Sequence, residues 1–360
     1  MPSEKPIRVA LLGYGHGGSV FHAPLIAATP GMTLAAIVTN TPERRARAAR
    51  DFPDAAILAS ADEVWRDAAR YDLVVVATPN RTHVPLALAA MHAGLPVVVD
   101  KPIAATAADA QRLLESSRET GQMLSVFQNA RWSSTFLTVR QLLDDGLLGP
   151  VIRFEARMER YRPEPRAGAW RERGAPEEAG GLLYDLGSHL IDQVLVLFGQ
   201  PRRVYAELAH HRPRTAVDDD TFVAIEFEHD IHAHLWMSYL VRAPGPAVRV
   251  WGLRGMYEKL TGDPQEDALR QGRRPGGSDW GVEPRERWGR LVTDAANLQV
   301  DGFVETLPGN YPGYYAALRD ALLSGGPPPV DPDDAVQTLR VIEAAQRSAR
   351  EHTIVEMAHR

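Results

Sequence analysis

Absences set the first limits on what this chain can be. It contains no cysteine, so disulfide bonds and thiolate chemistry are excluded. No apolar run approaches the roughly 20 residues that cross a bilayer, and the N-terminal MPSEKP lacks the apolar character of a signal peptide. The 40 Lys and Arg are outnumbered by 46 Asp and Glu, and the net charge of -6 gives no support for a basic nucleic-acid-binding face. We therefore expect a cytoplasmic protein that binds neither nucleic acid nor a membrane.

The 360 residues are enough for two globular domains, and the first third has a pattern of its own. There, short apolar runs alternate with amphipathic segments such as residues 82–93 and 106–120, which is the pattern of βαβ units on a parallel sheet. The expected strands show no polar alternation, as is typical of strands buried on both faces. They are residues 7–12, 34–38, 73–77, 96–99 and 123–126. This pattern predicts an α/β domain over residues 1–126.

Residues 127–360 follow a different pattern. Helices are expected over residues 133–145 and 182–198, with a strand over 151–160 between them. Four strand-like segments then follow without a helix among them: residues 204–210, 221–228, 231–239 and 248–251. Consecutive strands favour an antiparallel sheet, so this part is predicted to be an α+β domain. Residues 261–310 are expected to be irregular, and two closing helices, 314–324 and 333–350, are candidates to pack back on the first domain.

A glycine loop follows the first expected strand. Gly13, Gly15 and Gly18 occupy the glycine positions of G-x-G-x-x-G, with His16 between them. Such glycines permit a tight turn, a close approach of backbone to pyrophosphate, and close packing of helix on strand. The helix N-terminus then offers unpaired N–H groups to the phosphates. Because the motif opens a βαβ unit, it predicts a Rossmann dinucleotide site.

The end of the second expected strand bears on which dinucleotide binds. An Asp or Glu there pairs with the ribose hydroxyls of NAD and repels a 2′-phosphate. This chain has Thr39 and Asn40 instead, with Arg44 one helical turn further on. Hydroxyl, amide and guanidinium groups can hold a phosphate, so NADP(H) is favoured and NAD(H) is the alternative. In the competing interpretation, Arg44 and Arg45 simply face solvent.

Three more motifs carry a resemblance. They are ATPNRTH over residues 77–83, Asp100-Lys101-Pro102 at the end of an expected strand, and GGLLYDLGSHLID over residues 180–192. In order and spacing they resemble the glucose–fructose oxidoreductase/inositol dehydrogenase/MocA (Gfo/Idh/MocA) family, over essentially the whole chain. Four stretches are similar to its branch of NADP-dependent scyllo-inositol dehydrogenases: FHAPL (21–25), VFQNARW (126–132), RYRP (160–163) and DPQE (263–266).

The resemblance implies a Rossmann domain followed by an α+β domain with an open antiparallel sheet, whose exposed face commonly forms an oligomer interface. A homodimer or homotetramer is therefore expected. It implies an active-site lysine at Lys101 and catalytic or substrate-binding roles for Asp185 and His189. The chain departs from the family in one place, because Asp100 stands where a Glu usually precedes the lysine. The motifs also supply binding candidates. For the cofactor these are Thr78, Pro79, Asn80, His83, Asp100 and Lys101, and for the substrate they are Lys101, Asn129, Arg131, Tyr161, Asp185 and His189.

The residues themselves suit alcohol oxidation. When a hydride leaves carbon, a proton must leave the hydroxyl, and histidine is a suitable base near neutral pH. Asp185 and His189 are four residues apart on an expected helix and so share a face. Lys101 can polarise the reacting oxygen, while the order of proton transfer between Lys101 and His189 stays open. The glycines at 180 and 181 are expected to let a substrate approach the start of this helix.

Other residues receive simpler interpretations. Asp218-Asp219-Asp220 is expected to be a solvated turn, and His232 and His234 to lie on an exposed strand face without a metal. Trp170, Trp280 and Trp288 could line a sugar site or pack loops. The leading function is an NADP(H)-dependent dehydrogenase or reductase of a cyclitol or sugar. The alternatives are an enzyme that cleaves glycosides by transient oxidation and a dinucleotide-binding sensor.

Overall fold

The computed structural model describes residues 5–165, 178–213 and 215–358. The chain forms two compact units, each assembled from separate stretches of sequence. The first comprises Met1–Asn129, Gln265–Trp280 and Asn310–Val336, and the second comprises Ala130–Pro264, Gly281–Gly309 and Gln337–Arg360. Within the described ranges, no helix is both long and apolar enough to pass through a bilayer.

The first unit contains a parallel six-stranded sheet in the order β3-β2-β1-β4-β5-β6. Its strands are β1 (Ile7–Leu12), β2 (Met32–Val38), β3 (Ala56–Leu58), β4 (Leu73–Val76), β5 (Val97–Asp100) and β6 (Leu124–Phe127). This is the strand order of the doubly wound Rossmann fold. The predicted α/β domain is thus confirmed. The short β3 was not expected, because its three residues are too few to show a period.

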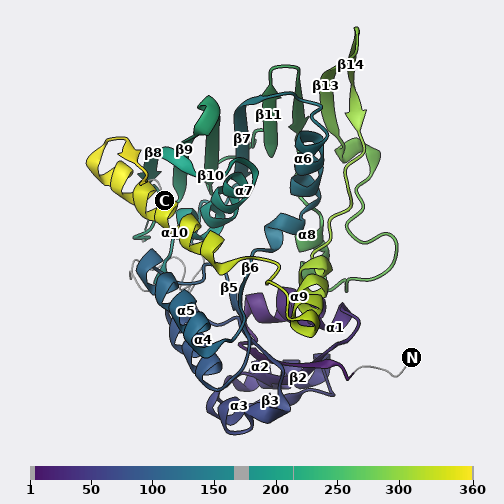
Figure 1. The fold of residues 1–360 in the computed structure, drawn as a ribbon, viewed down its shortest axis with the longest axis vertical. Helices are drawn as coiled ribbons and strands as arrows, with labels where there is room; N and C mark the ends of the chain where they lie inside the picture. The colour runs from purple at the N-terminus through teal and green to yellow at the C-terminus, as the bar shows by residue number, and fades with distance from the viewer. Residues whose placement is uncertain (1–4, 166–177, 214, 359–360) are drawn as a thin grey trace. The chain divides into compact units, whose positions relative to one another are not determined.

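Helices cover this sheet. Figure 1 shows α4 packed with α5, and α1 beside α9. The helical elements of this unit are η1 (Gly17–His22), α1 (Ala23–Ala28), α2 (Pro42–Asp51), α3 (Asp62–Arg66), η2 (Ala68–Arg70), η3 (Asn80–Thr82), α4 (His83–His92), α5 (Ala107–Thr120), α8 (Gln265–Arg270) and α9 (Pro312–Ser324). Helix α5 is capped by Thr106, whose hydroxyl accepts the Asp109 N–H.

Two late segments of chain complete the first unit through buried hydrogen bonds. The Gln265 side-chain oxygen accepts both the Trp280 indole N–H at 2.8 Å and the Tyr311 backbone N–H at 2.7 Å. The Tyr314 hydroxyl bonds the Ser125 hydroxyl on β6 at 3.0 Å. Gln265 belongs to the DPQE stretch, so its role is structural.

The second unit is built on a nine-stranded sheet in the order β14-β13-β12-β11-β7-β10-β9-β8-β15. Neighbours are antiparallel except β7 and β10, so the predicted mainly antiparallel sheet is confirmed. Its strands are β7 (Val151–Glu159), β8 (Pro201–Ala209), β9 (Asp220–Phe227), β10 (His232–Ser238), β11 (Val248–Gly252), β12 (Gly255–Lys259), β13 (Gly289–Ala295), β14 (Leu298–Val304) and β15 (Val355–Glu356). The other elements are η4 (Asn129–Trp132), α6 (Ser134–Asp144), η7 (Leu183–Gly187), α7 (Ser188–Phe198), η8 (Glu228–Asp230), η9 (Arg285–Arg287) and α10 (Pro332–Glu351), and the boundary between the units crosses η4 and α10.

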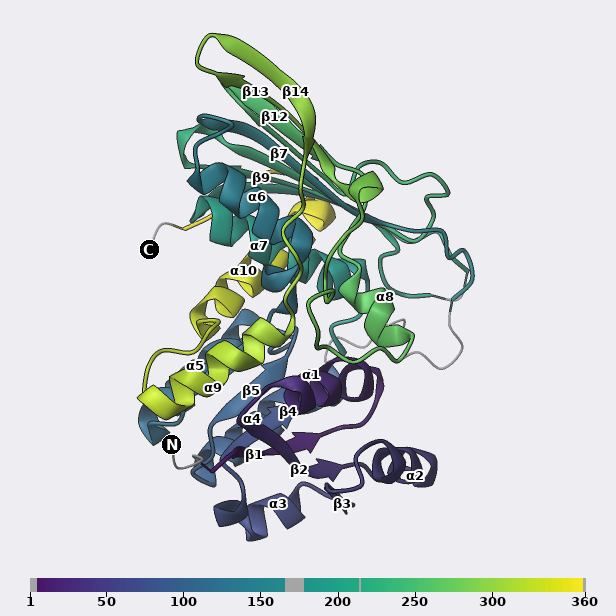
Figure 2. The same ribbon diagram turned by 90° about the vertical axis from the view of Figure 1, so that its right-hand side faces the viewer.

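Helices α6 and α7 lie on one face of this sheet, and in Figure 2 the described residues place no helix of the unit on the opposite face. Side chains alternate accordingly. On β10, Ala233, Leu235 and Met237 are buried, whereas His234 and Trp236 on the other face are partly exposed. We call that second face the open face.

The expectation of irregular chain over residues 261–310 was wrong. It contains α8 and the hairpin of β13 and β14. The hairpin stands at the edge of the sheet, with Leu298, Val300 and Phe303 exposed. Without a buried face it has no clean apolar alternation, and that alternation is the signal by which strands are recognised in a sequence.

Candidate active site

The glycine loop of the first unit has the geometry that its motif requires. A Cβ atom on Gly13, where φ is +101°, would lie 2.5 Å from the Ala77 carbonyl oxygen. A Cβ on Gly18 would lie 2.0 Å from the Gly13 carbonyl oxygen, so both glycines are fixed by packing of the loop on itself and on β4. Beside Gly15 there is open space, with the Arg44 guanidinium at 4.0 Å from the Cβ position. This space is where a phosphate can approach the backbone, so the loop fits a dinucleotide. His16 is exposed on the same loop.

The residues after β2 that are expected to select between NADP(H) and NAD(H) differ in their burial and in their hydrogen bonds. Arg45 donates to the Thr39 and Ile57 carbonyl oxygens at 3.3 and 3.2 Å and therefore joins β2 to β3. Arg44 and Asn40 are exposed, and Arg44 reaches back toward Gly15. Thr39 is buried. Arg44, rather than Arg45, thus has a guanidinium group on the cofactor side of the loop.

The ATPNRTH segment follows β4 and is held by His83. The ring Nδ1 lies 2.8 Å from the Pro102 carbonyl oxygen, and Nε2 lies 2.9 Å from the Thr78 carbonyl oxygen. His83 is buried, and its ring joins the turn after β4 to the turn after β5. Thr78 and Pro79 are partly exposed, while Asn80 is buried at the start of η3. His83 therefore holds the two loops in place rather than projecting toward a ligand.

Asp100 and Lys101 stand at the carboxyl end of β5, the edge where open α/β sheets bind ligands. Asp100 Oδ1 accepts the Lys101 backbone N–H at 2.8 Å. Burial opposes ionisation of this carboxyl. The polar contact and charge of His22, together with the charges of His83 and Lys101, outweigh that effect and hold the pKa of Asp100 well below its usual range. Asp100 is therefore an anion beside the candidate lysine.

Asp185 and His189 lie in the second unit, on consecutive helical elements. Asp185 is in the π-helical turn η7, and His189 is in the first turn of α7. Both are partly exposed, and the Tyr239 hydroxyl donates to the Asp185 carboxylate at 3.4 Å. Burial and the Asp185 charge raise the pKa of Tyr239, so this hydroxyl keeps its proton. The glycine loop also leads into a π-helical element, η1, and π-turns are frequent at functional sites.

The start of η7 differs from the expectation. Gly181, with φ of +91°, leaves room for Asp218 rather than for a substrate, because its Cβ would lie 1.9 Å from the Asp218 carboxylate. Asp218 accepts the Leu183 N–H and the Thr221 hydroxyl, each at 2.7 Å. Burial raises the pKa of Asp218, and these hydrogen bonds oppose the rise. Asp218 thus caps the element that carries Asp185.

The solvated-turn interpretation of residues 218–220 was therefore wrong for two of the three. Asp219 is fully buried and accepts the backbone N–H groups of His211 and Arg212, each at 2.8 Å, as well as the Arg212 guanidinium. Only Asp220 is exposed. A run of three aspartates has the composition of a surface turn. The backbone N–H groups that Asp218 and Asp219 accept come from other segments of the chain, so the run by itself does not reveal them.

The remaining substrate candidates are Arg131 and Tyr161, whose side chains bond other residues of the protein, and Asn129, which is buried. Arg131 makes a two-pronged ion pair with buried Asp192 on α7, at 2.8 and 2.7 Å. The Tyr161 hydroxyl accepts from Arg242 at 2.8 Å, and Tyr161 is 44% exposed. Asn129, the last residue of the N-terminal segment of the first unit, is buried. Arg131 therefore orients the helix that carries His189.

The tryptophans pack loops. The Trp280 indole is buried against Gln265, and the Trp288 indole donates to the Glu283 carbonyl oxygen at 3.2 Å. Trp170 lies outside the described residues. His232 is exposed, and the ring of His234 lies against Phe222 and Trp236 on the open face.

Comparison with known proteins shows which family the chain belongs to. Residues 7–128 match the model of the oxidoreductase family with an NAD-binding Rossmann fold, and residues 140–357 match the C-terminal alpha/beta domain of the same family. The chain belongs to the Gfo/Idh/MocA oxidoreductase family. As a member of that family, it is an enzyme of the oxidoreductase class with an NAD(P)-binding Rossmann domain.

Individual relatives cover the whole chain. It is 41% identical to the oxidoreductase YdgJ of Escherichia coli, over 98% of this chain and 99% of YdgJ. It is 36% identical to IolW of Bacillus subtilis, named scyllo-inositol 2-dehydrogenase (NADP(+)), over 98% of this chain and 96% of IolW. Among solved structures, the oxidoreductase YvaA from Bacillus subtilis superposes with a TM-score of 0.93 at 34% identity, over 99% of each chain.

Three polar residues beside the candidate groups were not among the expected site residues: the capping residue Asp218, the Arg131 partner Asp192, and the histidine of FHAPL, His22. Asp192 carried a detectable signal, because it follows His189 by three residues on the same predicted helix. Asp218 carried none, because it lies 35 residues from the N–H that it accepts. His22 lies in the FHAPL stretch, which by itself indicates no chemical role for the histidine.

Proposed function

We propose that this protein is an NADP(H)-dependent oxidoreductase that transfers a hydride between the nicotinamide and a secondary alcohol or ketone of a cyclitol or sugar. One observation carries the substrate class: nearly the full length of the chain is 36% identical to a scyllo-inositol 2-dehydrogenase (NADP(+)). The presence of Lys101, Asp185 and His189 agrees with it, because a polar, multiply hydroxylated substrate requires both proton transfer and hydroxyl-binding groups.

Each candidate residue has a separate role in this reaction. When bound, the nicotinamide supplies the site that donates or accepts the hydride. The backbone around Gly15 holds the pyrophosphate at the start of η1. Lys101 polarises the reacting oxygen, and His189 takes or returns its proton. Asp185 either binds a neighbouring hydroxyl or orients His189, with its own position set by Tyr239 and by the capped start of η7.

Preference for NADP(H) is supported by Arg44 and by the absence of an acid from the Val38-Thr39-Asn40 end of β2. A charge-assisted contact to a phosphate contributes about 1.5–3 kcal/mol. We expect NADPH to bind at least tenfold more tightly than NADH by calorimetry, and Arg44→Ala to remove most of that difference. Arg50→Ala is the matched control, because Arg50 is another exposed arginine on the same helix and lies 3.8 Å from the Asp51 carboxylate. Equal dissociation constants of the native protein for the two cofactors would contradict the preference.

A turnover screen tests the reaction. Cyclitols and sugars are each incubated with NADP⁺ and the protein, and NADPH is followed by its absorbance. Net NADPH formation with a cyclitol or sugar supports the proposal. Cleavage of a glycoside without net NADPH would favour transient oxidation, and tight NADPH binding without turnover across the panel would favour a sensor.

Self-association through the open face is part of the proposal. Arg157 stacks on Trp236 at 4.0 Å and Arg153 stacks on Trp251 at 4.2 Å, both on this face. Arginine and tryptophan are enriched at the energetic centres of protein interfaces. A homodimer or homotetramer that buries these pairs accounts for large aromatic side chains on an uncovered sheet face.

A further inference from the structure

His22 stands at a junction inside the first unit that the proposed reaction has not used. It is the last residue of η1, the element that follows the glycine loop, and its side chain is fully buried. Its ring lies 4.3 Å from the Phe127 ring, centroid to centroid. Nδ1 is 2.6 Å from the Tyr315 hydroxyl on α9, and Nε2 is 3.6 Å from Asp100 Oδ2 on β5. One imidazole thus connects α9 to the carboxylate that precedes Lys101.

The chemistry of these partners fixes where the ring carries its hydrogen. Burial raises the pKa of Tyr315 well above its ordinary value, with further contributions from Tyr314 and Asp100, so the phenol keeps its proton. A neutral imidazole then accepts a hydrogen bond from the Tyr315 hydroxyl at Nδ1 and carries its own hydrogen at Nε2. The opposite tautomer would point a nitrogen lone pair at a carboxylate 3.6 Å away, which is repulsive. If the ring is charged, Nε2 also carries a hydrogen.

Asp100 is held from several sides. Oδ1 accepts the Lys101 N–H at 2.8 Å, and Oδ2 lies 2.7 Å from where a Cβ on Gly17 would stand. Gly17 is not one of the three motif glycines, and its lack of a side chain leaves room for this carboxylate. The titratable groups that lower the pKa of Asp100 are His22 from η1, His83 from α4 and Lys101 beside it, and Tyr315 on α9 is a further titratable group whose own pKa is raised by the Asp100 charge. Among these groups, His22 makes the largest contribution that opposes the effect of burial on the pKa of Asp100.

We propose that His22 and Tyr315 are positioning residues that hold the Asp100 carboxylate in place, and that through Asp100 they set the position of Lys101. The inference rests on the proposed function only for its kinetic consequences. It also links the dinucleotide-binding loop to the candidate lysine, because His22 is carried by the element that begins in that loop and contacts the residue that precedes Lys101.

Substitution of His22 tests this with the whole protein and an established substrate. His22→Phe keeps a flat ring against Phe127 but removes the ring nitrogen that faces Asp100. A displacement of a reacting group by about 1 Å costs about 10²-fold in rate, so kcat should fall by that order with a smaller change in KM. The acid limb of the kcat/KM profile should move to higher pH, because the largest effect that opposes burial is then lost and the pKa of Asp100 rises. His22→Gln, whose amide can donate at the Nε2 position, should restore much of kcat and return the limb toward its native position.

Neighbouring tyrosines provide a matched control. Tyr315→Phe removes the hydroxyl that fixes His22, whereas Tyr314→Phe removes a hydroxyl bonded to Ser125. Both rings are fully buried, so the two variants should lose similar thermal stability. Only Tyr315→Phe should lower kcat and move the acid limb. Equal kinetic effects of the two variants, or none from either, would overturn the proposal.

A second measurement does not depend on turnover. In protein labelled with ¹⁵N-histidine, the resonances lost in His22→Gln belong to His22 and report its protonation. Hydrogen at Nε2, in the neutral or charged ring, supports the proposal, and hydrogen at Nδ1 alone overturns it. If no polyol or sugar is turned over, the proposed function fails while this spectrum still decides the state of His22.

Discussion

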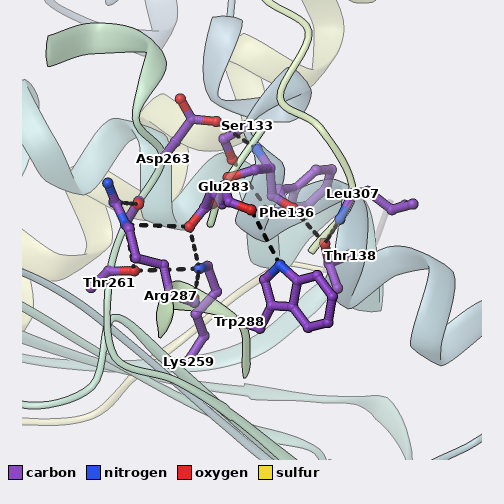
Figure 3. A network of polar contacts seen from close by, with 12 residues as sticks. Ser133, Phe136, Thr138, Lys259, Thr261, Asp263, Glu283, Arg287, Trp288 and Leu307 are labelled. Atoms are coloured by element: carbon purple, nitrogen blue, oxygen red, sulfur yellow. Dashed lines mark hydrogen bonds and ion pairs between the residues drawn. The ribbon is translucent and has the colours of Figure 1, made fainter. Parts of the chain in front are cut away.

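Removing the ammonium group of Lys259 should destabilise the second unit by several kcal/mol. Figure 3 shows this side chain pointing toward the Glu283 carboxylate inside a polar network. Lys259 and Glu283 are both fully buried, with Nζ 2.7 Å from Oε2. Nζ also donates to the Arg287 carbonyl oxygen at 2.6 Å and to the Thr261 hydroxyl at 3.3 Å. The network joins the end of β12 to the loop before β13.

The geometry sets the magnitude. Glu283 also accepts the Ser134 hydroxyl at 2.5 Å, and the Arg287 Nε lies 3.4 Å from its carboxylate. After Lys259→Met, Arg287 compensates the Glu283 charge only in part, because Arg287 is one-third exposed. Breaking a buried ion pair by removing one partner costs about 3–5 kcal/mol, and we expect Lys259→Met to fall in that range. Burial lowers the pKa of Lys259, and the hydrogen bond and charge of Glu283 oppose that effect.

A double-mutant cycle separates the pair from its surroundings. Lys259→Met and Glu283→Leu should each be costly alone, but the double variant should cost about as much as one single variant, because no uncompensated charge is left. Arg290→Met is the matched control, because Arg290 pairs with Asp301 in the same unit with both side chains half-exposed. It should cost about 1 kcal/mol or less.

Reversible urea unfolding followed by tryptophan fluorescence measures these differences, with Trp288 beside the network as a local reporter. The chain has three lysines, Lys5, Lys101 and Lys259, so amine acetylation read by mass spectrometry gives an independent check. Lys259 should resist acetylation in the folded protein. Lys259→Met within about 1 kcal/mol of the native protein, or strictly additive single variants, would refute the reasoning.

Three further predictions follow from the site and the open face. Lys101→Met and His189→Ala should each lower turnover by ~10²–10⁴ with NADPH affinity nearly unchanged, and the double variant should be far less than multiplicatively worse; single variants with native turnover would remove their catalytic assignment. Asp218→Ala should destabilise the start of η7 by about 2 kcal/mol and reduce activity, because it leaves the Leu183 N–H without its acceptor. Asp220→Ala, at an exposed neighbouring residue, is the control and should change stability by about 0.5 kcal/mol or less. Sedimentation at micromolar concentration should show a dimer or tetramer, and Trp236→Glu should shift it toward monomer; a monomeric native protein would contradict assembly through the open face.

Much of the fold was predictable because the signals are local. The bounds of β1 agree residue for residue with the expected strand, and the glycine loop follows it as the motif requires. Apolar runs without alternation identified strands buried on both faces. The β13–β14 hairpin could not be predicted, because it lacks a local signal. An exposed hairpin at the edge of a sheet does not show the polar–apolar alternation that one buried face imposes.

The sequence by itself determined the doubly wound domain, the glycine loop, the candidate lysine and the spacing of Asp185 from His189, because each depends on residues close together in the chain. Only the tertiary structure decided which polar groups are structural. Asp218 and Asp219 have the composition of a surface turn, but Asp219 is buried and both carboxylates accept backbone N–H groups from other segments of the chain. His22 and Tyr315 are 293 residues apart, and their hydrogen bond exists only because α9 returns to the first unit. Hydrogen bonds and ion pairs of this kind depend on distances in space, which no spacing along the chain records.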